Sequence, residues 1–190
     1  MSENMRIVLL GPPGSGKGTQ AERLAGHLDL PWISTGQLLR DAVAGGSDLG
    51  KRICELLDAG QLVDDETMAD MVRDRLSQPD TAAGFLLDGY PRTEVQADTL
   101  GGILQDRGES LSRVLFIDVP PEELVKRALA RNRGADDREE VFRSRLEVYA
   151  EKTEPLIEYY KGFGLLESIN GNQSIDEVTE EITARLAVGV

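Results

Sequence analysis

Short apolar runs alternate with amphipathic stretches along most of this chain. Three runs are almost continuously apolar and predict strands at residues 6–10, 85–88 and 114–119. Two weaker runs predict strands at residues 31–33 and 165–169. Between them, helical spacing of apolar residues predicts helices over residues 19–28, 36–44, 67–76, 94–106, 121–130, 139–160 and 174–187. Because strands bounded by amphipathic helices build βαβ units, this order predicts a parallel sheet with helices on both faces.

The helical pattern is interrupted once, between residues 41 and 62. Gly45, Gly46 and Gly50 fall inside this stretch, so it is predicted to form two helices with a joint that could act as a hinge. No internal repeat and no break in composition marks a second independent domain, and the 190 residues are predicted to fold as one α/β domain.

Composition narrows the possible partners. A formal net charge of −13 argues against a polynucleotide ligand, although a small anion needs only local positive charge. Cys54 and His27 are the only residues of their types, so a disulfide or a nitrogen and sulfur metal site within one chain is excluded. No apolar run approaches the ~20 residues of a membrane span, and the first residues lack a basic signal region. These features predict a cytoplasmic protein that binds neither nucleic acid nor membrane. Nothing in the sequence suggests a large exposed apolar face, so we expect a monomer.

Residues 11–20, GPPGSGKGTQ, follow the first apolar run and form the first chemical motif. Glycines let backbone N–H groups converge on an anion, and the helix that follows adds its positive N-terminal dipole. Lys17 is spaced to reach the terminal phosphates of a nucleoside triphosphate. Gly18 stands where the general phosphate-loop motif has Ser or Thr, and Thr19 comes one residue later. The alternative is a plain glycine-rich turn from strand to helix.

A second motif ends the apolar run at residues 85–88. Asp88 stands at the tip of this predicted strand, where a carboxylate beside a phosphate loop holds Mg²⁺ through water. Gly89 permits a positive φ, Pro91 stiffens the turn, and Arg92 is predicted to project into the same crevice. The alternatives are a turn cap for Asp88 and a surface arginine for Arg92.

Basic side chains gather in one segment of this acidic chain. Six arginines lie there, namely Arg127, Arg131, Arg133, Arg138, Arg143 and Arg145. Arg138 and Arg143 are assigned to surface ion pairs with nearby acids, and the other four to phosphate oxygens, which suit the planar guanidinium fork.

Polar residues before two predicted helices are explained in part by capping. Ser34 or Thr35 caps one helix and residues 64–66 begin another, but capping does not account for Arg40.

Together these stretches resemble the adenylate kinase family in its short-lid form, over essentially the whole chain. The resemblance rests on GPPGSGKGTQ, on STGQLLR followed by QLV, on GYPR with Gln96 four residues on, and on DD…RLEVY…TEPLIEYY. Glycine after the lysine is that family's own variant of the phosphate loop. The resemblance implies a three-layer P-loop NTPase fold with a central five-stranded parallel sheet. It divides the single domain 1–190 into a core (1–33, 64–126, 139–190), an AMP-binding helical flap (34–63) and a short lid (about 127–138).

The resemblance also implies an activity and a site, namely reversible transfer of a phosphoryl group from Mg-ATP to AMP, giving two ADP. Its ATP contacts are Gly14, Ser15, Gly16, Lys17, Gly18, Thr19, Arg127, Arg131 and Gln173. Its AMP contacts are Thr35, Arg40, Gln61, Leu62, Val63, Gly89, Tyr90, Pro91, Arg92, Gln96, Arg133 and Arg145. The implied catalytic side chains are Lys17, Arg92, Arg127, Arg133 and Arg145. Mg²⁺ is the implied cofactor, with Asp88 as its water-mediated ligand, and no structural zinc is expected.

Two other functions remain open at this stage. The first is a UMP/CMP kinase of the same fold, against which Thr35 argues because those relatives tend to have alanine there. The second is an ATP-binding regulatory switch, which has no use for Arg40, Arg92 and Gln96 as a second phosphate and base site. The chain also departs from the resembled family at Gln37, where aspartate is usual, and in its lid sequence.

Overall fold

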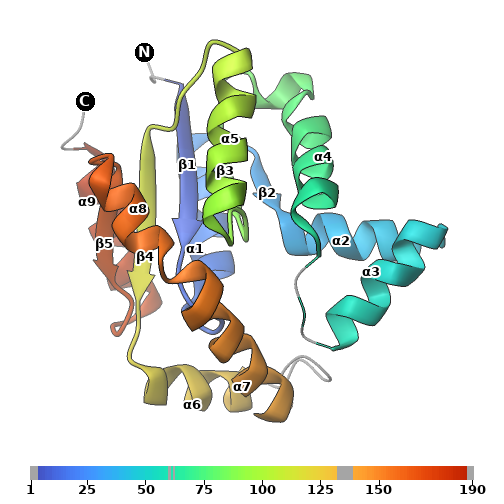
Figure 1. Ribbon diagram of the computed structural model, residues 1–190. Coiled ribbons are helices and arrows are strands. Elements are labelled where there is room, and N and C mark those ends of the chain that lie inside the picture. Colours follow the sequence, from blue (N-terminus) through green and yellow to red (C-terminus); the bar gives the residue numbers. More distant parts are fainter. Residues whose placement is uncertain (1–3, 60, 62, 132–138, 188–190) are drawn as a thin grey trace.

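A central sheet of five parallel strands organises the molecule (Figure 1). The computed structural model describes residues 4–59, 61, 63–131 and 139–187. Its strands are β1 (Met5–Leu10), β2 (Trp32–Ser34), β3 (Gly84–Asp88), β4 (Arg113–Asp118) and β5 (Leu166–Asn170). Their order is β2-β3-β1-β4-β5, so β1 lies at the centre and all carboxyl ends meet at one edge. The predicted five-stranded parallel sheet is confirmed.

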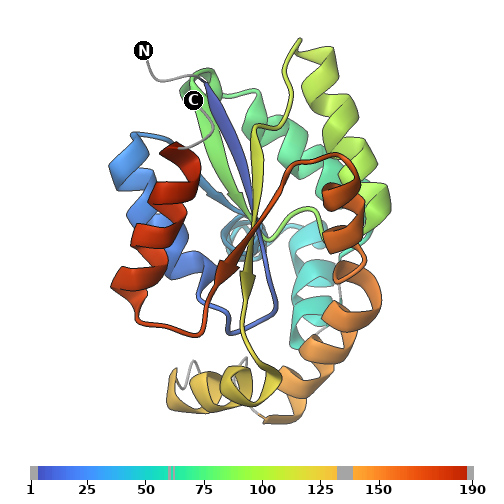
Figure 2. The same cartoon turned by 90° about the vertical axis from the view of Figure 1, so that its left-hand side faces the viewer.

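Helices cover both faces of the sheet and make three layers (Figure 2). One face packs against α1 (Lys17–Leu28) and α9 (Ile175–Ala187), and the other against α4 (Asp65–Leu76), α5 (Glu94–Asp106) and α8 (Leu156–Gly162). Ile7 and Leu9 of β1 join the first core, whereas Val8 and Leu10 join the second. Burial on both faces is why β1 reads as a continuous apolar run.

The remaining helices stand at the carboxyl edge of the sheet (Figure 1). On one side α2 (Thr35–Ala44) and α3 (Asp48–Asp58) project away from the sheet, and Gly46 between them has a φ of 69°. The predicted joint is therefore confirmed. On the other side α6 (Pro121–Arg131) and α7 (Glu139–Val148) lie below β4, and Phe142 of α7 packs with Leu124 of α6. Because ligands of parallel α/β sheets bind at the carboxyl ends of the strands, we expect the site between these two pairs of helices.

The single helix predicted over residues 139–160 is wrong. The helix α7 ends at Val148 and is followed by a π-helical turn, η3 (Tyr149–Thr153), and then by α8. In that turn the N–H of Glu154 donates to the carbonyl of Tyr149, five residues back, at 2.9 Å. Pro155 has no N–H to continue the regular pattern, and this explains the break. A short 3₁₀ turn, η1 (Pro79–Thr81), precedes β3.

Several local predictions are confirmed at helix ends and on the surface. Ser34 caps α2 by accepting from the N–H of Gln37 at 3.4 Å, and Asp64 caps α4 by accepting from Thr67 at 2.8 Å. Arg143 pairs with Glu139 one helical turn earlier, at 2.8 Å. Arg138 lies outside the described residues. Across the described ranges, every helix is too short or too polar to cross a bilayer.

One buried ion pair should make stability depend on pH. The side chain of Glu109 is 14% exposed, and its Oε2 accepts from Arg107 Nε at 2.9 Å and lies 3.0 Å from Arg6 Nε. Burial raises the pKa of Glu109, but the hydrogen bonds from Arg107 and the positive charge of Arg6 outweigh it and hold that pKa below its ordinary 4.5. The ion pair therefore stabilises the fold above pH 4.5, and this contribution is lost as the pH falls through the lowered value.

Glu109→Gln should lower the free energy of unfolding by about 2 kcal/mol at pH 7 and by much less near pH 3. Urea unfolding at both pH values measures the difference. Glu158→Gln is the matched control. The side chain of Glu158 is 76% exposed, so its ion pair with Lys161 contributes little to stability. An equal loss at both pH values would show that Glu109 acts through packing rather than charge.

Candidate active site

The loop after β1 has a backbone shape that only its glycines allow. Gly14 and Gly16 have φ of 84° and 96°, and Gly16 is the N-cap of α1. A Cβ on Gly14 would lie 3.2 Å from the carbonyl oxygen of Leu124 and 3.3 Å from the ring of Phe142. The helices α6 and α7 therefore leave no room for a side chain at Gly14. The loop delivers its N–H groups to the start of α1, which is a binding site for anions.

Lys17 and Asp88 place a cation and a carboxylate at this loop. Lys17 Nζ donates to the carbonyl oxygens of Gly11 at 2.6 Å and Pro12 at 2.9 Å, so its charge is held over the loop. A Cβ on Gly18 would lie 4.0 Å from Asp88 Oδ2. Burial raises the pKa of Asp88, while the positive charges of Lys17 and Arg92 lower it. The structure thus brings both motifs found in the sequence to one place.

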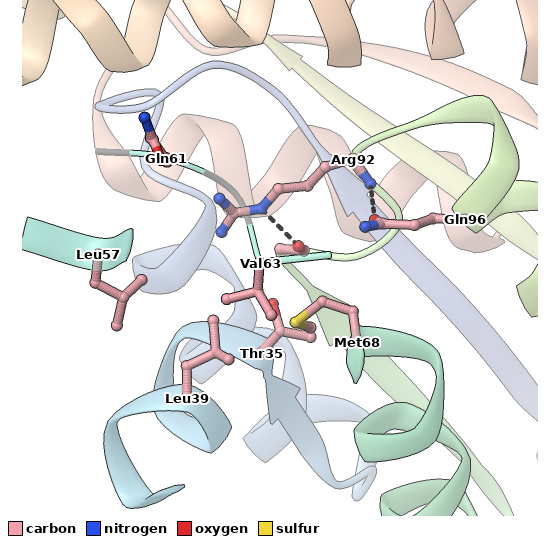
Figure 3. Close-up of a pocket in the computed structure, with 9 residues that line it drawn as sticks. Thr35, Leu39, Leu57, Gln61, Val63, Met68, Arg92 and Gln96 are labelled. Atoms are coloured by element: carbon pink, nitrogen blue, oxygen red, sulfur yellow. Dashed lines mark hydrogen bonds between the residues drawn. The ribbon is translucent and has the colours of Figure 1, made fainter. Parts of the chain in front are cut away.

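A second pocket opens between the sheet edge, α2, α3 and α4 (Figure 3). Six of the residues implied for AMP line it, namely Thr35, Gln61, Val63, Gly89, Arg92 and Gln96. Three apolar side chains complete its wall, namely Leu39 of α2, Leu57 of α3 and Met68 of α4. Apolar walls with a few polar groups suit a flat nucleobase joined to an anionic group.

Gly89 allows the close approach of two side chains at the floor of this pocket. Its φ is 86°, and a Cβ there would lie 2.5 Å from Thr35 Oγ1. Thr35 Oγ1 donates to the carbonyl of Asp88 at 3.3 Å, and Arg92 Nε donates to the carbonyl of Gly89 at 2.8 Å. The backbone of Asp88 and Gly89 therefore positions the polar groups of this pocket next to the phosphate loop.

Arg92 is the residue at which the two sites meet. Burial lowers the pKa of Arg92, the positive charge of Arg145 lowers it further, and the negative charge of Asp88 raises it. Its backbone is held on both sides, since its N–H donates to Gln96 Oε1 at 2.7 Å and its carbonyl accepts from Thr153 Oγ1 at 2.8 Å. Two arginines whose charges repel at a partly buried position are suited to binding an anion between them.

Arg127 approaches the loop that follows β5. Its guanidinium donates to the carbonyl of Gly171 at 3.0 Å and pairs with Glu123 at 3.2 Å. In the same loop, Gln173 Nε2 donates to Glu181 of α9 at 2.7 Å, so its side chain is turned toward that helix. The structure therefore brings Arg127 and the loop of Gln173 together. Because the side chain of Gln173 is bound to α9, a ligand would contact this loop through its backbone.

Several implied site residues lie elsewhere or outside the described residues. Arg40 is exposed and donates to Gln37 Oε1 at 2.8 Å, away from the walls of the second pocket. The ring of Tyr90 is 1% exposed in the core, and burial raises its pKa to about 12, while Pro91 is buried beside it. Leu62 and Arg133 lie outside the described residues, as does the side chain of Arg131.

Sequence reasoning missed the apolar wall and one carboxylate. Leu39, Leu57 and Met68 fit the apolar faces of their helices, so nothing local separates them from core residues. Asp65 is one of the acids expected to begin α4, yet its Oδ1 accepts from Gln96 Nε2 at 2.8 Å. Only the packing of α4 against α5 reveals this contact.

The fold and the phosphate loop define a P-loop kinase of the nucleoside monophosphate type. The family model described as adenylate kinase matches residues 9–165 of the chain. The adenylate kinase of Stenotrophomonas maltophilia is 46% identical over 185 residues, covering 96% of this chain and 99% of the relative. That of Thermobifida fusca is 49% identical over 185 residues, covering 96% and 98%. The chain belongs to the adenylate kinase family.

This membership confirms the resemblance found in the sequence, and with it the enzyme class and the reaction. The chain is a transferase that moves a phosphoryl group from ATP to AMP and gives two ADP. The match to the adenylate kinase of Kosmotoga olearia, at 42% identity, extends over 212 residues while covering the same 96% of this chain and 99% of that relative. That relative is therefore longer than this chain.

Proposed function

We propose that the phosphate loop holds the donor, ATP, and that the pocket lined by Thr35, Arg92 and Gln96 holds the acceptor, AMP. The observation that carries this proposal is the position of Arg92. Its charge interacts with Asp88 beside the loop and with Arg145 of α7, while its backbone binds Gln96 in the pocket wall. A phosphoryl group passing between the two nucleotides would cross this point.

The catalytic work assigned to the protein is positioning and charge neutralisation. The phosphate of AMP is already an anionic nucleophile, so no general base is needed, and in-line placement is the main requirement. Lys17 would leave the carbonyl groups of Gly11 and Pro12 for the terminal phosphates of ATP. Arg92 would bind the phosphate of AMP, Arg145 would bridge the reacting phosphates, and Arg127 would stabilise the donor.

Asp88 is the residue we assign to Mg²⁺. A magnesium ion that arrives with ATP needs one or two carboxylates and keeps several waters, and the carboxylate of Asp88 near Gly18 at the start of α1 fits that requirement. Elsewhere in the described residues no three acidic, histidine or cysteine side chains come together to form a metal cage. When bound, Mg²⁺ would offset charge on the donor phosphates.

The remaining roles depend on movement of the two peripheral parts. We assign residues 34–63 to a flap that would carry Arg40 to the AMP phosphate, and residues of about 127–138 to a short lid carrying Arg131 and Arg133. Leu62, Tyr90 and Pro91 would serve AMP through the backbone, and the loop of Gln173 would serve the adenine of ATP. We also assign the protein to the cytoplasm as a monomer, and the net charge of −13 supports the monomer because a highly charged surface opposes self-association.

A comparison of acceptors tests the proposed pocket. With ATP as donor, a coupled assay of ADP formation should give a kcat/KM for AMP that exceeds the values for CMP and UMP by at least about 10²-fold. The expected reason is that polar groups in the pocket wall would be left unpaired by a pyrimidine. A preference for UMP would overturn the assignment of the pocket to AMP and favour the UMP/CMP kinase alternative.

A further inference from the structure

The amide of Gln96 has only one possible orientation. The side chain is 2% exposed in the wall of the second pocket. Its Oε1 accepts from the N–H of Arg92 at 2.7 Å, as Figure 3 shows, and its Nε2 donates to Asp65 Oδ1 at 2.8 Å. A carboxylate only accepts and a backbone N–H only donates. Turning the amide over would therefore set oxygen against oxygen on one side and N–H against N–H on the other.

The amide of Gln96 can form two more hydrogen bonds, and its fixed orientation decides which side donates and which accepts. Among the described residues, Gln96 uses one of its two Nε2 hydrogens in the bond to Asp65 and one of its two Oε1 lone pairs in the bond from Arg92. A donor and an acceptor are left for the pocket. They pair with a base edge that offers an exocyclic N–H beside a ring-nitrogen acceptor, which a 6-aminopurine has. A 6-oxopurine offers the reverse, a carbonyl oxygen beside a ring N–H.

A glutamine that could turn over would accept either base. Discrimination between the two edges therefore comes from whatever prevents the turn. Two groups do so, the N–H of Arg92 and the carboxylate of Asp65. The carboxylate is also held in place by the N-cap residue of α5, because Thr93 Oγ1 donates to Asp65 Oδ1 at 3.3 Å. Asp65 itself is absent from the pocket lining, so it acts through Gln96.

We propose that Asp65 is a positioning residue that sets base specificity, by holding Gln96 in the orientation that accepts a 6-aminopurine and rejects a 6-oxopurine. This inference rests on the proposed assignment of the pocket to the acceptor nucleotide. It gives a role in substrate choice to the first residue of α4, beyond the cap that Asp64 provides.

The test compares AMP with IMP, which has the same size but the reversed edge. Asp65→Asn keeps the shape of the side chain but can donate as well as accept, so one of the two restraints on the amide is lost. The ratio of kcat/KM for AMP to that for IMP should fall about tenfold, the effect expected when one hydrogen bond to a charged group no longer opposes the turn. An unchanged ratio would overturn the inference.

Two further variants separate this inference from its premise. Glu66→Gln removes an exposed acid from the same first turn of α4 and should leave the ratio as in the parent enzyme. Gln96→Leu tests the premise, and it should abolish most of the preference for AMP over IMP. If Gln96→Leu leaves the preference intact, the pocket assignment fails. If it removes the preference while Asp65→Asn does not, only the role of Asp65 fails. Because each ratio is taken within one variant, a loss of folded protein does not affect it.

Discussion

Lys17→Met is expected to lower kcat by about 10³-fold or more while the fold remains intact. Lys17 starts α1 at the mouth of the phosphate loop and carries the positive charge held over it. Charge that develops on the transferred phosphoryl group is stabilised mainly by such preorganised cations, and removing one costs 10²-fold or more. Methionine keeps the unbranched stem but offers neither charge nor donor.

Single-turnover measurement of ADP formation gives the effect on the chemical step, and circular dichroism with thermal unfolding checks the fold. Lys51→Met is the matched control, because that lysine is 71% exposed on α3, far along the chain from the loop, and pairs only with a nearby exposed aspartate among the described residues. It should keep the parent rate. A Lys17→Met variant with near-normal turnover would mean that the phosphate loop is not the donor site.

Arg92→Ala is expected to lower kcat/KM for AMP by about 10³-fold. The substitution removes a guanidinium whose position is fixed by its hydrogen bond to Gly89 and whose charge adds to that of Arg145. Bidentate contacts between arginine and phosphate are strong because both partners are charged and planar geometry aligns two hydrogen bonds. The loss should include the transition state, since arginines that contact a transferring phosphoryl group contribute 10³-fold or more.

Steady-state rates with varied AMP at saturating ATP measure this loss. Arg143→Ala is the control, because its guanidinium is exposed on α7 and pairs with Glu139. That variant removes one positive charge from the same region and should keep the activity within about twofold, as expected for a surface ion pair. Undiminished phosphorylation of AMP by Arg92→Ala would refute the assignment of the acceptor site.

The sheet and the phosphate loop could be predicted because their signals are local. Strands buried on both faces must be apolar throughout, and a glycine-rich loop with a correctly spaced lysine needs no distant partner to be identified. The end of α7 at Val148 could not be predicted from the sequence pattern. The apolar spacing stays helical through Pro155, so it does not reveal the π-helical turn, within which Thr153 donates to the carbonyl of Arg92.

The acceptor pocket shows where sequence reasoning stops. Arg92 and Gln96 stand in a recognisable motif, but the role of Gln96 depends on Asp65, which is 31 residues away and looks like an ordinary helix start. Arg40 gives the opposite case. Its motif implies a phosphate contact, whereas the structure has it bound to Gln37 on an exposed face. The contact of Gln96 depends on how α4 is placed against α5, which no local pattern encodes, whereas the contact of Arg40 is made within α2, one helical turn away.

The central claim is that the donor and the acceptor occupy separate halves of one site, with Lys17 in the first half and Arg92 in the second. Isothermal titration calorimetry of ATP and of AMP against both variants tests it most directly. Lys17→Met should weaken binding of ATP and leave binding of AMP within about twofold, and Arg92→Ala should weaken binding of AMP at least about tenfold and leave binding of ATP nearly unchanged. Equal weakening of both nucleotides by either variant, or loss of ATP alone in Arg92→Ala, would contradict it.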